Sequence, residues 1–247
     1  MDGGALVGAP LLLAIELLVL YAAGSYAMGR LVSFAGSGGV LILGRSAFYL
    51  LVFPGVVLHE SAHYLACLIT GTKVVRFAPF SPRRATDSRL VLGYVRHERR
   101  AFPIRAIIGL APVLLNPLGL LFTTALLTPL TFRQVADPSV GMVVKGIFAS
   151  GFPAGVPLQA AGWAYLSLSF ALGSVPSRED LSSLPLLLAV LGVGIPIVGS
   201  LRIGTEGVLS SAAYDLSALA AGLYALPAAV AAGGALAMGL LGRPRQW

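Results

Sequence analysis

An apolar run from residue 46 to residue 70 most restricts how this chain can fold. As an α-helix it would measure about 37 Å at about 1.5 Å per residue, enough to cross the roughly 30 Å hydrocarbon core of a bilayer. Charged residues make up only 11% of the chain, against about 25% in an ordinary soluble domain. We therefore predict an all-α polytopic membrane protein with about six transmembrane helices. The predicted spans are residues 10–28, 46–70, 103–129, 156–173, 181–201 and 208–241.

The run at 46–70 contains the sequence His59-Glu60-Ser61-Ala62-His63, an H-E-x-x-H motif. On a helix, residues i and i+4 share one face and lie about 6 Å apart along the axis. Two imidazoles in this arrangement can bind one tetrahedral Zn²⁺, while a glutamate about 100° round the helix can reach a water molecule without being a ligand. We therefore predict His59 and His63 as metal ligands and Glu60 as the catalytic general base.

The H-E-x-x-H motif also occurs by chance in chains that bind no metal. Inside a membrane span, however, two histidines and a glutamate are costly unless they are paired, coordinated or facing a wet cavity. This cost favours the metal site over the chance interpretation.

A catalytic zinc normally has three protein ligands and one open position, so a third ligand must come from another part of the chain. Asp180 is preferred because it follows a proline-containing break between two spans, where irregular backbone can turn a carboxylate towards a cavity. Its alternative role is to cap the following helix, where an acidic residue is stabilised by the helix dipole. The remaining acidic candidates for the third ligand are Glu179, Asp215, Glu206 and Glu16.

Three other residues of ligating type receive different roles. Cys67 lies about 12 Å from His59 along the helix axis, too far to share its metal, so we expect a small buried core residue. His97 falls in a charged cluster at residues 96–100 and is expected to be solvated. Glu16 lies in the middle of the first span. We expect its side chain to make a polar contact inside the helical bundle, in preference to binding the metal. The single cysteine also excludes a disulfide framework and a Cys₄ zinc site.

The polar segment after the motif helix has the pattern of two short strands around a turn-rich sequence at residues 81–87. Gly71 is expected to end the preceding helix. We predict a small β-hairpin at the membrane surface, within a basic segment at about residues 72–102. The net charge of +7 and the pI near 10 then indicate contact with anionic lipid headgroups and not with nucleic acid.

The distribution of basic residues predicts an orientation. With six spans, twelve of the lysines and arginines lie on the side of the termini and five on the other side. The positive-inside rule therefore places both termini, the hairpin and Asp180 on the cytoplasmic side, and we expect the membrane to be the cell membrane. His63 would lie about 10 Å below that same boundary, so Asp180 and the motif are expected at the same membrane depth.

The motif in the second span, Pro112 and Asn116 in the third, and a Pro176-x-x-x-Asp180 element after the fourth resemble the site-2 protease family of intramembrane zinc metalloproteases. The resemblance extends over about residues 46–200, the expected catalytic core of a single membrane-embedded domain at 1–247.

This resemblance implies one Zn²⁺ per chain, bound by His59, His63 and Asp180, with Glu60 activating water to cut a substrate helix in the membrane. The sequence departs from the family pattern at Glu179-Asp180-Leu181, where the family has Leu-Asp-Gly, and lacks the usual upstream asparagine near residues 172–173. With these departures, the chain resembles a divergent member of the site-2 protease family.

The expected function is hydrolysis of a peptide bond in or near a transmembrane segment of a single-span or membrane-anchored protein substrate. One alternative is a catalytically silent relative that acts as a scaffold for membrane proteins. A less favoured alternative is an ion transporter that uses Glu16, Glu60 and Asp215 as acids along an ion path. Three measurements distinguish these functions. Proteolysis identifies the protease, zinc binding without proteolysis identifies the scaffold, and ion flux identifies the transporter.

Overall fold

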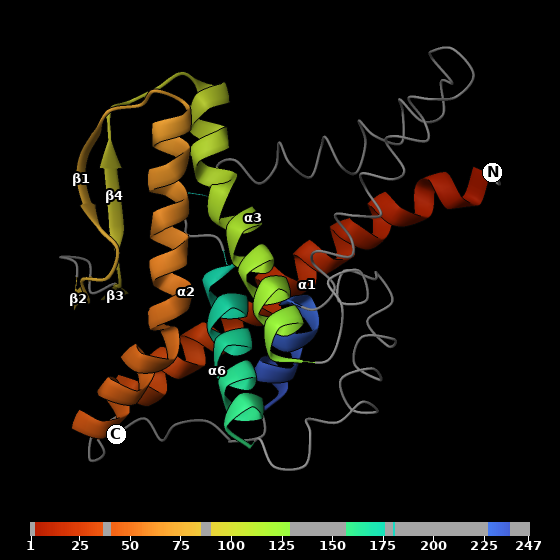
Figure 1. Ribbon diagram of the computed structural model, residues 1–247, viewed down its shortest axis with the longest axis vertical. Helices are drawn as coiled ribbons and strands as arrows, with labels where there is room; N and C mark the ends of the chain where they lie inside the picture. Colours follow the sequence, from red (N-terminus) through yellow and green to blue (C-terminus); the bar gives the residue numbers. More distant parts are fainter. Residues whose placement is uncertain are drawn as a thin grey trace.

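The computed structural model describes residues 3–36, 41–84, 90–128, 157–175, 180 and 227–237. These residues are mostly helical (Figure 1), and two short two-stranded sheets are formed by the segment between the second and third helices of the sequence. The helices are α1 (Gly3–Gly36), α2 (Leu41–Ile69), α3 (Phe102–Leu127), α6 (Pro157–Gly173) and a short segment at Pro227–Ala237.

Three of these helices contain stretches long and apolar enough to cross a membrane: Ile15–Ser33, Arg45–Ile69 and Phe102–Leu127. They correspond to the first three predicted spans and are consistent with a membrane protein. The fourth predicted span is α6, which at 17 residues is about 26 Å long. The fifth predicted span, 181–201, lies outside the described residues, as does most of the sixth.

Helix α2 packs against every other major element of the described structure. In Figure 1 its N-terminal part runs in a different direction from the rest of the helix, and Pro54 lies inside the helix. A proline inside a helix removes one backbone hydrogen bond and commonly bends the helix, as expected for the Pro54-Gly55 pair. Buried apolar residues of α1, α2 and α6 form one core cluster: Ala27, Phe48, Val52, Val56 and Leu172.

The predicted hairpin is present. Strand β1 (Val74–Ala78) pairs antiparallel with β4 (Tyr94–His97), and the short strands β2 (Arg83–Arg84) and β3 (Leu90–Val91) pair further out. The hairpin lies along α2 (Figure 1). Aromatic rings of the hairpin contact rings of α2. Phe77 stacks on Tyr64 at 4.7 Å between ring centroids, and Phe80 meets Phe53 edge-on at 5.0 Å.

The base of the hairpin is closed by hydrogen bonds. Gly71 has a φ of 62°, in the left-handed region that glycine adopts easily, and the next residue donates its backbone N–H to the carbonyl of Cys67 at 2.7 Å. At the other end of the hairpin, the Arg100 guanidinium donates to the Gly71 carbonyl at 2.6 Å. The predicted helix end at Gly71 is therefore confirmed, and both ends of the hairpin are joined at this point.

Candidate metal centre

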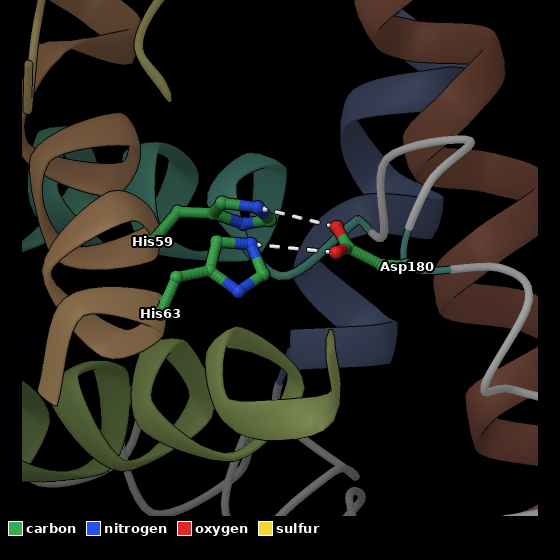
Figure 2. A group of neighbouring side chains, drawn as sticks. All are labelled: His59, His63 and Asp180. Atoms are coloured by element: carbon green, nitrogen blue, oxygen red, sulfur yellow. Dashed lines mark ion pairs between the residues drawn. The ribbon is translucent and has the colours of Figure 1, made fainter. Parts of the chain in front are cut away.

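His59 and His63 lie one turn apart on α2, and their rings are 4.9 Å apart between centroids. Figure 2 shows both imidazoles extending from α2 towards Asp180, which belongs to a distant part of the sequence. Nε2 of His59 is 3.4 Å from Oδ2 of Asp180, and Nε2 of His63 is 3.3 Å from Oδ1. The structure thus brings together the three residues predicted as ligands.

The three side chains are placed so that they could hold a metal ion. One ligand atom from each of His59, His63 and Asp180 can be chosen so that all lie within 4.8 Å of one another. Ligand atoms bound tetrahedrally at about 2.0–2.2 Å are about 3.3–3.6 Å apart. The two contacts of the histidines with Asp180, each to a different carboxylate oxygen, are 3.4 and 3.3 Å and lie in this range. Two imidazole nitrogens and one carboxylate oxygen also form a donor set found at catalytic zinc, which leaves a fourth position open.

The site is shielded from solvent by protein. The side chains of His59 and His63 are 11% and 12% exposed, and that of Asp180 is 6% exposed. A buried carboxylate is stabilised when a cation or hydrogen-bond donors lie beside it. A metal ion bound by these three residues would supply that compensation within the apolar bundle.

The second nitrogen of each imidazole is held by a backbone carbonyl. Nδ1 of His59 lies 2.8 Å from the carbonyl oxygen of Gly173, and Nδ1 of His63 lies 2.8 Å from that of Ile108. Because a carbonyl can only accept, each Nδ1 must carry the proton and donate it. In the neutral ring, Nε2 then presents its lone pair towards Asp180, which is the tautomer a metal ligand requires.

Gly173 occupies a tight junction of three helices. A side chain at this position would place its Cβ 2.6 Å from the Gly55 carbonyl oxygen of α2 and 2.7 Å from Oδ1 of Asn116 in α3. One turn earlier on α6, the hydroxyl of Ser169 accepts the backbone N–H of Gly55 at 2.9 Å. The close approach that these glycines permit places the Gly173 carbonyl within reach of His59.

The side chain of Glu60 lies next to the hairpin, beside Gly93. A Cβ on Gly93, between β3 and β4, would lie 2.7 Å from Cγ of Glu60 and 2.7 Å from the carbonyl oxygen of Pro79. The side chain of Glu60 is partly buried, and it also makes an interaction within the protein. The hairpin backbone therefore forms one boundary of the space that this carboxylate occupies.

The other residues of ligating type fall into separate places. Cys67 is a free, fully buried thiol packed with Ala66 and Ile108, as expected for a core residue. His97 hydrogen-bonds through Nδ1 to the carbonyl of Glu98 at an exposed position. Three of the alternative third ligands lie outside the described residues: Glu179, Glu206 and Asp215.

The prediction for Glu16 is confirmed in its burial, and its expected polar contact is not found among the described residues. Its side chain is buried in α1, as expected, with the residue 6% exposed. Within the described structure, however, neither carboxylate oxygen has a hydrogen-bond partner, so the expected polar contact is not found. Glu16 also lies outside the group of His59, His63 and Asp180.

Sequence reasoning did not identify Gly173, Ile108 or Gly93. The end of α6 at Gly173 is a usable signal, because the last carbonyls of a helix have no helical donor. For Ile108 the signal is a proline one helical turn later in the sequence. The contact of Gly93 with Glu60 joins residues far apart in the chain, and no local pattern indicates it.

In comparisons with protein-family models, with curated proteins and with solved structures, no match to this chain was found.

Proposed function

We propose that the protein is an intramembrane zinc metalloprotease that hydrolyses a peptide bond in or near a transmembrane segment of a membrane-protein substrate. The observation that supports this most is the convergence of two imidazole Nε2 atoms on the Asp180 carboxylate, beside a glutamate of the same helix. The three ligating residues are buried among apolar helices, which favours a substrate that is itself in the membrane.

In this proposal His59, His63 and Asp180 hold one Zn²⁺. When bound, the metal polarises a carbonyl and makes a water molecule acidic enough to lose a proton near neutral pH. A carboxylate oxygen of Glu60 accepts that proton as the water oxygen bonds to the peptide carbonyl carbon. Glu60 then delivers the proton to the amide nitrogen as the C–N bond breaks, which leaves a carboxylic acid and an amine. The carbonyls of Gly173 and Ile108 keep the two imidazoles in the ligating tautomer throughout.

The substrate must present an extended peptide bond, because a helical backbone shields its carbonyls. Among the described residues, β1 and β4 pair only with each other, so each has a free edge to which an unwound substrate strand could add. The basic residues of the hairpin are proposed to rest on anionic headgroups, with both termini and the hairpin in the cytoplasm.

The proposal is tested first by metal content. We expect about one zinc per chain in detergent-purified protein, and loss of this zinc in His59→Ala and in Asp180→Ala. Retention in Asp180→Ala would move the third ligand to another acidic residue. A well-folded parent without metal would contradict the proposed enzyme and favour the silent scaffold.

The second test is cleavage in proteoliposomes of a single-span peptide that carries a Gly-Pro pair in its span, with products identified by mass spectrometry. Replacing Glu60→Gln should slow cleavage by about 100-fold or more, because it removes the general base. Zinc content should stay as in the parent. Equal cleavage by parent and Glu60→Gln would contradict the role of Glu60, and zinc without cleavage in either would favour the scaffold.

A further inference from the structure

The hydrogen bond from His63 ends on a carbonyl in the interior of a helix. Ile108 belongs to α3 (Phe102–Leu127), and its carbonyl oxygen accepts Nδ1 of His63 at 2.8 Å. In an α-helix this carbonyl would normally accept the backbone N–H of the residue four positions later. A histidine from a neighbouring helix would then have to compete for it.

The residue four positions after Ile108 is Pro112, which has no backbone N–H. The carbonyl of Ile108 therefore has no helical donor, although Ile108 itself is only 2% exposed. A buried carbonyl without a donor is costly, and in an apolar bundle a neighbouring helix must supply one. His63 supplies it.

The same arrangement occurs a second time, away from the histidines. Pro54 lies inside α2, so the carbonyl of Leu50 lacks its helical donor. The hydroxyl of Tyr165, on α6, donates to this carbonyl at 2.7 Å. In two helices, then, an internal proline releases a carbonyl and a polar side chain of another helix takes it.

We propose that Pro112 is a positioning residue of the metal centre. By withholding a backbone N–H, it leaves the Ile108 carbonyl free for Nδ1 of His63, and this bond directs Nε2 of His63 at the metal. The inference rests on the metal site of the proposed function and does not depend on proteolysis. A different role for Pro112, that of bending α3, requires the proline ring and not the missing N–H.

The test is the zinc affinity of the full-length, detergent-purified protein, measured by competition with a chelator. Pro112→Ala restores a backbone N–H that competes for the Ile108 carbonyl. Loss of such an outer-shell contact to a ligating histidine typically costs about 10- to 100-fold in metal affinity, and we expect a loss in that range. Pro117→Ala is the matched control in the same helix, since it restores an N–H directed at Val113, and it should leave the affinity unchanged.

A second variant separates the N–H from the proline ring. Lactic acid in place of Pro112 puts an ester in the backbone, which has neither the ring nor the N–H. We expect it to bind zinc as tightly as the parent. If this ester variant is as weak as Pro112→Ala, or if Pro112→Ala binds like the parent, the inference is wrong.

The outcomes also separate this inference from the proposed function. A folded parent that binds no zinc overturns both. A parent that binds zinc, with affinity unchanged in Pro112→Ala, overturns the inference and leaves the metal site standing. A parent that shows the expected affinity series but cleaves no peptide supports the inference and counts against the protease.

Discussion

The two sides of α2 are packed in different ways. Towards α3 and α6 the contacts involve backbone atoms: Nδ1 of each histidine meets a carbonyl, and Gly55 and Gly173 bring α2 and α6 together. Towards the hairpin the contacts are between side-chain rings, with centroids 4.7–6.2 Å apart. Backbone atoms move only when a whole helix moves, whereas rings can change rotamer. The two histidines are therefore held by the more rigid side of α2, while Glu60 is bounded by the side with more freedom.

Gly55→Ala should have the largest effect, because it acts on the backbone side. Its Cβ would lie 2.0 Å from the carbonyl oxygen of Ser169, so α2 and α6 would have to separate. We expect the free energy of unfolding to fall by about 1–3 kcal/mol and zinc to be lost, measured as thermal stability and metal content in detergent.

The control for Gly55→Ala is Gly162→Ala on α6, where an added Cβ meets no atom within 4 Å. This control should keep its zinc, and its stability should not fall. Unchanged stability and zinc content in Gly55→Ala would show that α2 and α6 can separate without cost. The side of α2 that faces α6 would then not be the more rigid one.

Gly93→Ala acts at the boundary of the two sides. Its Cβ would overlap Cγ of Glu60 and the carbonyl of Pro79, so the carboxylate must shift. A displacement of about 1 Å can cost about 100-fold in rate, and we expect a loss of that size in peptide cleavage with zinc content unchanged. Gly162→Ala on α6, whose added Cβ meets no atom within 4 Å, should cleave at the parent rate. Loss of zinc in Gly93→Ala would mean that the hairpin also supports the ligands.

Phe77→Leu should have the smallest effect, since it alters only ring packing. The substitution removes the stack on Tyr64, and such aromatic pairs contribute about 0.5–1.5 kcal/mol beyond the area they bury. We expect faster proteolytic cutting within the hairpin and an unchanged zinc affinity. A weaker zinc affinity in this variant would show that the two sides of α2 are coupled.

The parts of the site that depend on local sequence patterns were predictable from the sequence. The four-residue spacing of His59 and His63 is enough to place both rings on one helix face. Asp180 was predicted from its place after a proline-containing break between two spans, and the structure brings it within 3.4 Å of both histidines. The hairpin followed from strand and turn patterns in a short polar segment.

The contacts between distant residues were not predictable in this way. Which carbonyl a histidine meets depends on how helices cross, and the sequence of α2 alone contains no information on α6. Glu16 illustrates the limit, because its position in an apolar span indicates burial but not what lies opposite. Gly93 resembles any turn glycine until the structure places Glu60 beside it.

The closed base of the hairpin limits how the hairpin can move relative to α2. Because Arg100 holds the carbonyl of Gly71, and Thr72 is hydrogen-bonded to the last turn of α2, the hairpin cannot rotate away from the helix without breaking these bonds. An entrance on this side would therefore open at the outer half of the hairpin, around β2 and β3. Loop movements of that kind take about nanoseconds to microseconds, so in the proposed protease such an entrance would open and close many times during one catalytic cycle while the proposed ligands stay in place.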